Sequence, residues 1–387
     1  MIFFETRACI YPNCFEDSVK SHAISRSISL ESISEEHHLY SFSPRQNSKE
    51  TKVPLLQKIS TNKATRHFCF CDTHEKLFDD LDDKEIEMAK DIHLQVYRTL
   101  CVSYSEEKEA MLNMLMLNNP DSYKLIGLDV VVKYLVSDKK ESVIPKIKDP
   151  LVLEIVQKHI QHLIAEEIDK RFTSTELSIE RFRVLGDTCP DASIINNKMY
   201  TLCAESIDYN IYYYKTDFQI PVALSTSQPC CVGEQEFKVH LMVIPYVDST
   251  VIIGVVPDII RQDKRQVDKI NDYFTSKYKV IKYVESVMST SDGWFLKPSV
   301  IDGMSKEKLD FFTTDCMFIN ERKLFQQYDL SIFDELKIKV CGMDRNDLEL
   351  TSIPVREEYS SRYDKMLEVM KIKRDKQHEI KCVSFTD

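Results

Sequence analysis

The chain has 387 residues, of which 43% are hydrophobic and 29% are charged, and its formal net charge is −11 at pH 7. This composition predicts a globular protein with a sizeable core and two or three structural units, and its acidity argues against broad non-specific binding to phosphate. The 7 glycines form no Gly-rich phosphate loop, which disfavours hydride transfer and P-loop ATP hydrolysis. We expect a cytoplasmic protein with no membrane partner, because the first residues lack a basic leader and no apolar run approaches about 18 residues.

Near the N-terminus, two pairs of residues are spaced as ligands of one tetrahedral zinc ion. Cys9 and Cys14 flank a four-residue turn, and Cys71 and His74 form a Cys-x-x-His pair. In a reducing cytosol, paired cysteines are more typical of a metal site than of a disulfide. The sequence therefore predicts a structural zinc ion bound by three thiolates and one imidazole.

A further cysteine, Cys69, leaves an alternative open for the second pair. The Cys-Phe-Cys run that ends at Cys71 offers two thiolates, and either could bind zinc together with His74. Cys71 is favoured, because the Cys-x-x-His spacing lets both side chains converge where a turn enters a helix. Residues 2–7 are expected to form a short strand and residues 75–81 a helix, which is the order of a treble-clef zinc finger.

Between the two pairs lies Ser21-His22, with the histidine eight residues after Cys14. The arrangement Cys-x4-Cys, Ser-His-x-Ile and Phe-Cys-x-x-His followed by an acid resembles an N-terminal zinc finger of uncharacterised bacterial proteins. More distantly, it resembles nucleases of the HNH, or His-Me finger, class, and the resemblance covers roughly residues 5–80. In that class a neutral histidine activates water while a divalent ion on the phosphate acts as a Lewis acid.

The resemblance implies catalytic roles for three residues. His22 would be the general base, Glu75 would take the metal-binding place with Mg²⁺ or Mn²⁺, and Asn62 is the candidate for an asparagine expected before the second ligand pair. Glu75 stands where the family has a final histidine, and Asn62 falls at an imperfect spacing. An alternative role for His22 is structural, either capping a turn or binding zinc in place of Cys69.

The segment between the ligand pairs is basic although the chain is acidic. From residue 45 to residue 66 it holds six basic residues and one acidic residue, Glu50. We expect the basic residues to follow a nucleic-acid backbone, and they are Arg45, Lys49, Lys52, Lys58, Lys63 and Arg66. A solvated basic insertion would have the same polar composition and stays the alternative.

Helices are expected after the finger, and strands after the helices. Apolar residues recur at helical spacing over residues 84–104 and 105–118, and a third helix is predicted over residues 149–171. Predicted strands are residues 199–205, 209–214, 218–224, 237–245 and 251–256, and predicted helices after them are residues 261–274, 280–288 and 306–313. Trp294 is expected to anchor a loop to the core.

These elements predict an α+β fold in four parts. The parts are an N-terminal treble-clef zinc finger (residues 1–80), a helical connecting or dimerising region (81–180), an α+β domain with an antiparallel sheet and C-terminal helices (181–355), and a C-terminal helix and tail (356–387). The long amphipathic helices favour a homodimer.

Two functions fit this organisation. The first is a metal-dependent HNH-like nuclease acting on nucleic acid, on DNA more than on RNA, which the resemblance would place among bacterial antiviral defence effectors. The second is a non-catalytic, zinc-stabilised binding or sensor protein with a protein partner or trigger. Fold alone does not decide between them, because one scaffold serves many functions.

Overall fold

The computed structural model describes residues 9–42, 56–114, 198–201, 209–232, 235–257, 264–317 and 328–348. Of the helical region predicted at residues 81–180, it describes residues 81–114. The helix predicted over residues 149–171 and the helix and tail predicted at residues 356–387 lie outside the described residues.

The described chain contains strands and helices, which confirms the predicted α+β class. The strands are β1 (Lys20–His22), β2 (His38–Phe42), β3 (Leu56–Ser60), β4 (Arg66–Phe68), β5 (Lys198–Thr201), β6 (Tyr209–Thr216), β7 (Val222–Val232), β8 (Gln235–Pro245), β9 (Thr250–Pro257) and β10 (Trp294–Leu296). The helices are α1 (Glu31–Ile33), α2 (Asp72–Glu75), α3 (Asp79–Asp83), α4 (Ala89–Met114), α9 (Lys264–Tyr273), α10 (Lys277–Met288), α11 (Pro298–Asp302), α12 (Lys306–Met317) and α13 (Asp334–Cys341). Shorter helical turns are η1 (Arg26–Leu30), η3 (Lys76–Phe78) and η5 (Arg345–Leu348).

Eight of the strands form one antiparallel sheet, in the order β3-β2-β10-β7-β8-β9-β6-β5. The predicted hairpins are present where β7 pairs with β8 and β8 pairs with β9. β6 pairs with β9 rather than with β7, which follows it in sequence, so the sheet is not a simple succession of hairpins. The remaining two strands, β1 and β4, form a separate antiparallel pair.

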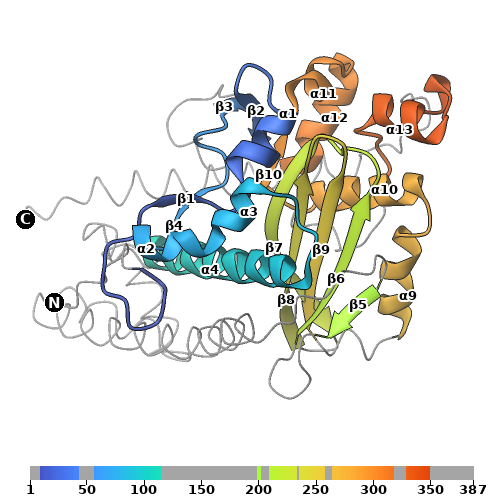
Figure 1. Cartoon of the computed structure of the whole chain (residues 1–387). Helices are drawn as coiled ribbons and strands as arrows, with labels where there is room; N and C mark the ends of the chain where they lie inside the picture. The colour runs from blue at the N-terminus through green and yellow to red at the C-terminus, as the bar shows by residue number, and fades with distance from the viewer. Residues whose placement is uncertain are drawn as a thin grey trace, which may run out of the picture.

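The large sheet separates two apolar cores, because successive side chains of a strand point to opposite faces. On β8, Leu241 and Val243 lie in one core, and Met242 and Ile244 lie in the other. The core around Met242 also contains the N-terminal elements and α4, and the core around Leu241 contains α9 to α12. Figure 1 accordingly shows α4 and the N-terminal elements on one side of the sheet and α10 on the other.

The N-terminal region contributes two strands to this sheet. β2 lies between β3 and β10, with Tyr40 opposite Leu296. A buried hydrogen bond adds to the connection, because the Ser29 hydroxyl donates to the Pro245 carbonyl of β8 at 2.8 Å, and a second one joins the N-terminal region to α4, where the Gln95 amide donates to the Ala23 carbonyl at 2.9 Å. Residues 38–42 and 56–60, which belong to the predicted finger, are therefore strands in the sheet of the predicted third part.

Helix α4 runs without a break through the position where two helices were predicted to meet. The expected boundary between residues 104 and 105 was wrong, because no Gly or Pro interrupts the sequence there. Cys101 and Tyr104 are buried in the core that the N-terminal region shares with the sheet, so the packed part of α4 extends up to that position.

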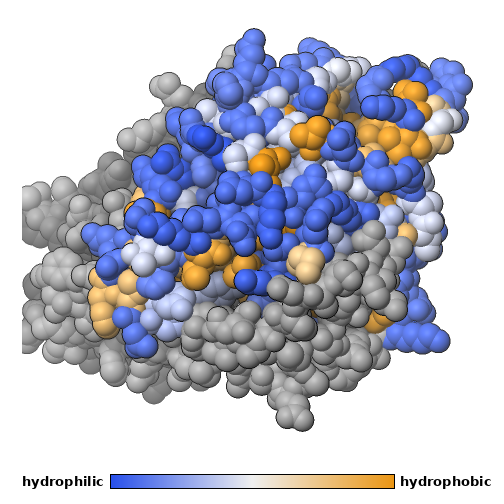
Figure 2. Space-filling model, viewed as in Figure 1, coloured by the Kyte–Doolittle hydropathy of each residue, from blue (hydrophilic) through white to orange (hydrophobic). Residues whose placement is uncertain are grey.

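On the face shown in Figure 2, the surface of the described residues is mainly polar. Hydrophilic residues cover most of the described surface on the face shown in Figure 2, with hydrophobic residues in separate patches among them. None of the described helices combines the length and the apolar composition that crossing a membrane requires.

The buried anchor role predicted for Trp294 is confirmed, although the residue lies in a strand and not in a loop. Trp294 begins β10, where it is opposite Leu224 of β7. Its ring is fully buried, and its centroid lies 5.6 Å from that of Phe312 on α12. The short strand β10 thereby connects the two N-terminal strands of the sheet to β7.

His240 on β8 makes the stability of the fold depend on pH. Its side chain is buried and its Nδ1 has no hydrogen-bond partner among the described residues. Burial, and secondarily the charge of Lys238, lower the pKa of His240 to about 4. The unfolded chain takes up a proton near pH 6.5 and the folded chain does not, so stability falls as the pH drops from about 6.5 to about 4.

We expect His240→Leu to remove this part of the pH dependence. The free energy of unfolding of the variant minus that of the wild type should be about 3 kcal/mol larger at pH 4 than at pH 7. Urea unfolding at pH 7, 5.5 and 4 measures the effect, with the exposed His38→Leu as the matched control. Equal pH dependence in the wild type and the His240 variant would show that His240 is not buried in its neutral form.

Candidate metal centre and the adjacent hairpin

Four side chains converge at the N-terminal end of the described chain. The ligand atoms of Cys9, Cys14, Cys71 and His74 all lie within 4.8 Å of one another. The Cys14 and Cys71 Sγ atoms are 3.8 Å apart, and His74 Nδ1 is 3.5 Å from Cys9 Sγ and 3.2 Å from Cys71 Sγ. The structure thus brings together the four residues whose spacing predicted a zinc site.

The Cys14–Cys71 and Cys9–His74 separations match edges of a zinc coordination tetrahedron, and the Cys71–His74 separation is slightly shorter than such an edge. With Zn–S bonds of about 2.3 Å and Zn–N bonds of about 2.0 Å, tetrahedral angles give edges of about 3.8 Å between two sulfurs and about 3.5 Å between sulfur and nitrogen. The donor set of three thiolates and one imidazole is also one that zinc prefers. The cluster could therefore hold a metal ion such as zinc.

Local backbone structure places the ligands. The Cys14 amide donates to the Tyr11 carbonyl at 3.1 Å, which closes the turn of the first pair, and Asn13 adopts a φ of 60° there. Asparagine tolerates this left-handed conformation better than most residues do. Cys71 precedes α2, and its carbonyl accepts the His74 amide at 3.0 Å. The second pair therefore sits where a turn enters a helix, as predicted.

Stacking orients one of the four side chains, and burial keeps the thiols protonated when no metal is bound. The Tyr11 ring stacks on the His74 ring with a centroid separation of 3.9 Å and an interplanar angle of 12°, which fixes the plane of the imidazole. Burial raises the pKa of the Cys9 thiol to about 11, and burial also raises the pKa of Cys71. Without a metal these thiols are protonated at neutral pH, so metal binding must release protons.

Cys69, the alternative ligand, lies outside the four-residue cluster. Its side chain is buried in the core, and burial raises the pKa of its thiol to about 12. Its backbone carbonyl accepts the Ile10 amide at 2.8 Å, which ties the two ligand-bearing segments together. Cys69 therefore acts as a packing residue, and Cys71 is the cysteine that faces His74.

His22 lies at the end of β1, on the hairpin that β1 forms with β4. Its Nδ1 lies 2.8 Å from the Ala64 carbonyl, which can only accept, so Nδ1 carries the proton. Burial first, and then the charges of Arg98, Arg26 and Arg66, lower the pKa of His22. At neutral pH the imidazole is therefore neutral, with an unprotonated Nε2 that has no hydrogen-bond partner among the described residues.

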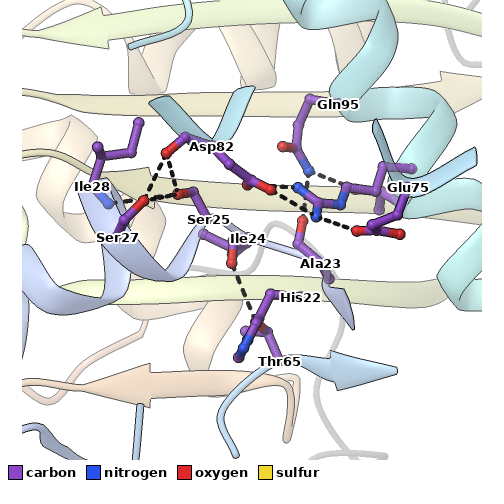
Figure 3. Close-up of polar contacts among 12 residues, drawn as sticks. His22, Ala23, Ile24, Ser25, Ser27, Ile28, Thr65, Glu75, Asp82 and Gln95 are labelled. Carbon is purple, nitrogen blue, oxygen red and sulfur yellow. Dashed lines mark hydrogen bonds and ion pairs between the residues drawn. The ribbon is translucent and has the colours of Figure 1, made fainter. Parts of the chain in front are cut away.

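Glu75, predicted to bind a catalytic metal, pairs with an arginine. Arg98 on α4 is only 2% exposed, and it donates to Glu75 Oε1 at 2.8 Å and to Asp82 Oδ1 at 2.9 Å. Burial raises the pKa of Glu75, and the Arg98 charge opposes that rise. Figure 3 shows the His22 ring pointing away from the Glu75 carboxylate. His22 and Glu75 therefore do not converge on one site.

Asn62, the third residue given a catalytic role by the resemblance, lies in the exposed turn between β3 and β4. Its Oδ1 accepts a hydrogen bond from the guanidinium of Arg26. This bond joins the turn to the start of η1. The amide oxygen that would bind a metal or a water molecule is thus already engaged by an arginine.

Three of the six basic residues of the predicted basic segment are described by the structure, and they lie at different places. Arg45, Lys49 and Lys52 lie outside the described residues. Lys58 on β3 lies 3.7 Å from Asp302 and covers the Tyr40 ring at 5.2 Å, so its charge is partly neutralised at the sheet edge. Lys63 and Arg66 are exposed and lie in the β3–β4 turn and on β4, close to His22.

Sequence reasoning missed the residues that support the site. Arg98 is the single charge in the largely apolar stretch from Val96 to Leu100, and a charge at such a position requires a buried partner. This signal could have indicated an ion pair with an acid such as Glu75 or Asp82. Tyr11 was missed as well, although an aromatic residue between two zinc-spaced cysteines lies close to any bound metal.

No protein-family model, curated protein sequence or solved structure matches this chain. The functional conclusion therefore depends on the chemistry of its own residues. A metal ion bound tetrahedrally by all four side chains would have no coordination position left for water or substrate, which is the arrangement of structural rather than catalytic zinc sites.

Proposed function

We propose that this chain is a zinc-stabilised binding protein, in which a structural zinc ion holds an N-terminal finger of treble-clef type against the sheet. The observation that carries the proposal is the set of separations among Cys9, Cys14, Cys71 and His74, which fit one tetrahedral ion. A closed set of four ligands supplies stability and does not itself supply a reactive water.

The contacts of Glu75 support a non-catalytic finger. A nuclease of the HNH class needs a second, open metal site beside its histidine, and Glu75 is the acid that the sequence offers for it. Arg98 neutralises this carboxylate from a buried position, and Asp82 occupies the other side of the guanidinium. Because Glu75 Oε1 accepts from the buried Arg98 guanidinium, a divalent cation at this carboxylate would have to lie beside a buried cation or displace it.

Metal analysis of purified protein tests the proposal. We expect one zinc ion per chain, retained through dialysis and removed only by a strong chelator, with loss of thermal stability on removal. Returning Zn²⁺ should restore stability, whereas Mg²⁺ should not, because thiolates prefer softer metals. Protein that is equally stable with and without zinc would overturn the structural role.

An HNH-like nuclease is the second candidate, and His22 is the observation that favours it. A general base needs an oriented, neutral imidazole with a free nitrogen, and the Ala64 carbonyl together with the lowered pKa gives His22 these properties. Under this function, Mg²⁺ or Mn²⁺ would bind near His22 and the remaining α+β part would sense a partner or trigger in a bacterial defence effector.

Cleavage assays separate the two functions. Supercoiled plasmid, linear DNA and RNA are incubated with zinc-loaded protein and Mg²⁺ or Mn²⁺, beside His22→Ala and the exposed control His38→Ala. We expect no cleavage by any of the three proteins. A nuclease function would be supported if the wild type and the His38 variant cleave nucleic acid and the His22 variant does not, while the zinc content of the His22 variant is unchanged. That result would overturn the proposed binding function.

A further inference from the structure

The outer face of the β1–β4 hairpin gathers cationic side chains. His22 lies directly opposite Arg66, and Lys20 lies opposite Phe68, so these four residues share one face. Ser21, between Lys20 and His22, is buried on the inner face. The ammonium of Lys20 lies 5.6 Å from the centroid of the Phe68 ring, and both Lys20 and Arg66 are exposed.

Two more exposed cations, Arg26 and Lys63, lie near His22. Arg26, exposed at the start of η1, bonds to Asn62, and the exposed Lys63 follows Asn62 in the turn that leads into β4. Arg26 and Arg66 are both close enough to His22 for their charges to act on its imidazole. We call the five residues Lys20, His22, Arg26, Lys63 and Arg66 the hairpin strip.

The cations of the hairpin strip form no ion pair with any acid in the part of the chain that the structure describes. The contacts of Lys20 and Arg26 are those to Phe68 and Asn62, and neither Lys63 nor Arg66 has a charged partner there. Some other exposed cations in the described part of the chain are paired, as Lys277 is with Asp217 and Arg345 with Glu335. A group of unpaired guanidinium and ammonium ions is suited to phosphate oxygens.

The hydrogen-bonding capacity of His22 restricts the class of ligand that the hairpin strip can recognise. With its proton on Nδ1, the half-buried imidazole offers only an acceptor at Nε2, and the charges of Arg26 and Arg66 act on the ring. A phosphate diester has no proton to donate to that nitrogen. A ribose 2′-hydroxyl does, and it lies one sugar away from the phosphates on either side, which is how proteins distinguish RNA from DNA.

We propose that the hairpin strip binds an RNA strand, with Arg26 and Arg66 on successive phosphates and His22 Nε2 accepting from the intervening 2′-hydroxyl. The inference rests on the proposed zinc-stabilised binding protein, because the ligand pairs hold both strands of the hairpin. The proposed ligand is RNA, whereas the sequence predicted DNA more than RNA. RNA is favoured because His22 Nε2 can accept a hydrogen bond from a ribose 2′-hydroxyl, and deoxyribose lacks that hydroxyl.

Fluorescence anisotropy with a labelled single-stranded RNA and the DNA of the same sequence tests the proposal. We expect the wild type to bind the RNA roughly 2- to 10-fold more tightly, as one additional hydrogen bond would give. His22→Asn is the informative variant, because the asparagine amide can still donate to the Ala64 carbonyl in place of Nδ1 while Nε2 is removed. It should bind RNA and DNA equally.

The arginines are tested by charge removal with a matched control. The double variant Arg26→Gln/Arg66→Gln should weaken binding to both nucleic acids and lower the salt dependence, d log K/d log[salt], by about 1 for each phosphate that is no longer neutralised. The control Lys269→Gln/Lys306→Gln removes two exposed cations on α9 and α12 and should bind as the wild type does.

Two results would overturn the RNA proposal. One is equal weakening by the hairpin and control double variants, which would indicate only a general charge effect. The other is a wild-type protein that fails to bind the RNA in 50 mM salt, or that binds the RNA and the DNA of the same sequence equally tightly. Zinc is measured in every sample: failure of RNA binding by zinc-loaded protein contradicts this proposal alone, whereas absence of zinc contradicts the proposed function.

Discussion

Cys71→Ser is expected to abolish zinc binding and to lower the stability of the protein by several kcal/mol, given the roughly 10 kcal/mol or more that a structural zinc supplies in isolated fingers. Cys71 contributes one of the four ligands and immediately precedes α2. Serine is a good helix N-cap, so the substitution does not weaken the start of the helix. The loss of stability therefore measures the effect of losing the bound zinc ion. Zinc content and thermal unfolding at pH 7 measure it.

Cys69→Ser is the matched control for this prediction. Cys69 is a thiol of similar burial two residues earlier in the chain, but it lies outside the ligand cluster. The variant should keep its zinc and lose only the stability expected from placing a hydroxyl in an apolar core, about 1 to 3 kcal/mol. Retention of zinc by the Cys71 variant and its loss by the Cys69 variant would make Cys69 the ligand.

Glu285→Gln should destabilise the opposite side of the molecule by about 3 to 5 kcal/mol, because it leaves two buried lysines without their counter-charge. Glu285 on α10 is fully buried, and its carboxylate accepts from Lys337 Nζ at 2.7 Å and lies 3.2 Å from Lys282 Nζ. Its Oε1 also accepts the backbone amides of Ile332 and Phe333 at the start of α13. Burial acts to raise the pKa of Glu285, but the two lysine charges outweigh it and lower the pKa.

The glutamine variant separates charge from shape. It keeps an oxygen for the two backbone amides, so most of the loss arises from the uncompensated lysines. Urea unfolding at pH 7 measures the effect, and the exposed ion-pair variant Glu335→Gln on α13 serves as the control, for which we expect little change. A Glu285 variant as stable as this control would show that Lys337 and Lys282 reach solvent.

The ligands of the metal centre could be predicted from sequence because their chemistry is local. The Cys-x4-Cys and Cys-x-x-His pairs each need only a turn, and the choice of Cys71 over Cys69 followed from the geometry of a helix start. The roles assigned to His22 and Glu75 depended on whether their side chains converge. That was decided by Arg98, whose position on α4 brings it to Glu75 through tertiary packing alone.

The strands of the large sheet were predictable individually, but their order was not. Alternation and β-branched content identified β6, β8 and β9 within a few residues of their observed bounds. Neither signal specifies which strands pair. The placement of β2 beside β10 depends on contacts between segments far apart in sequence, and no local pattern in residues 38–42 indicated it.

The pairing of β2 with β10 has a consequence for the order in which the chain acquires structure during synthesis. All four metal ligands have been made once residue 74 leaves the ribosome, whereas β2 must wait for Trp294–Leu296 to find its neighbour. At about 5 to 20 residues per second, roughly ten to fifty seconds separate the two events. During that interval a bound zinc ion would keep the nascent N-terminal segment compact and hold its unpaired strand edge away from other nascent chains.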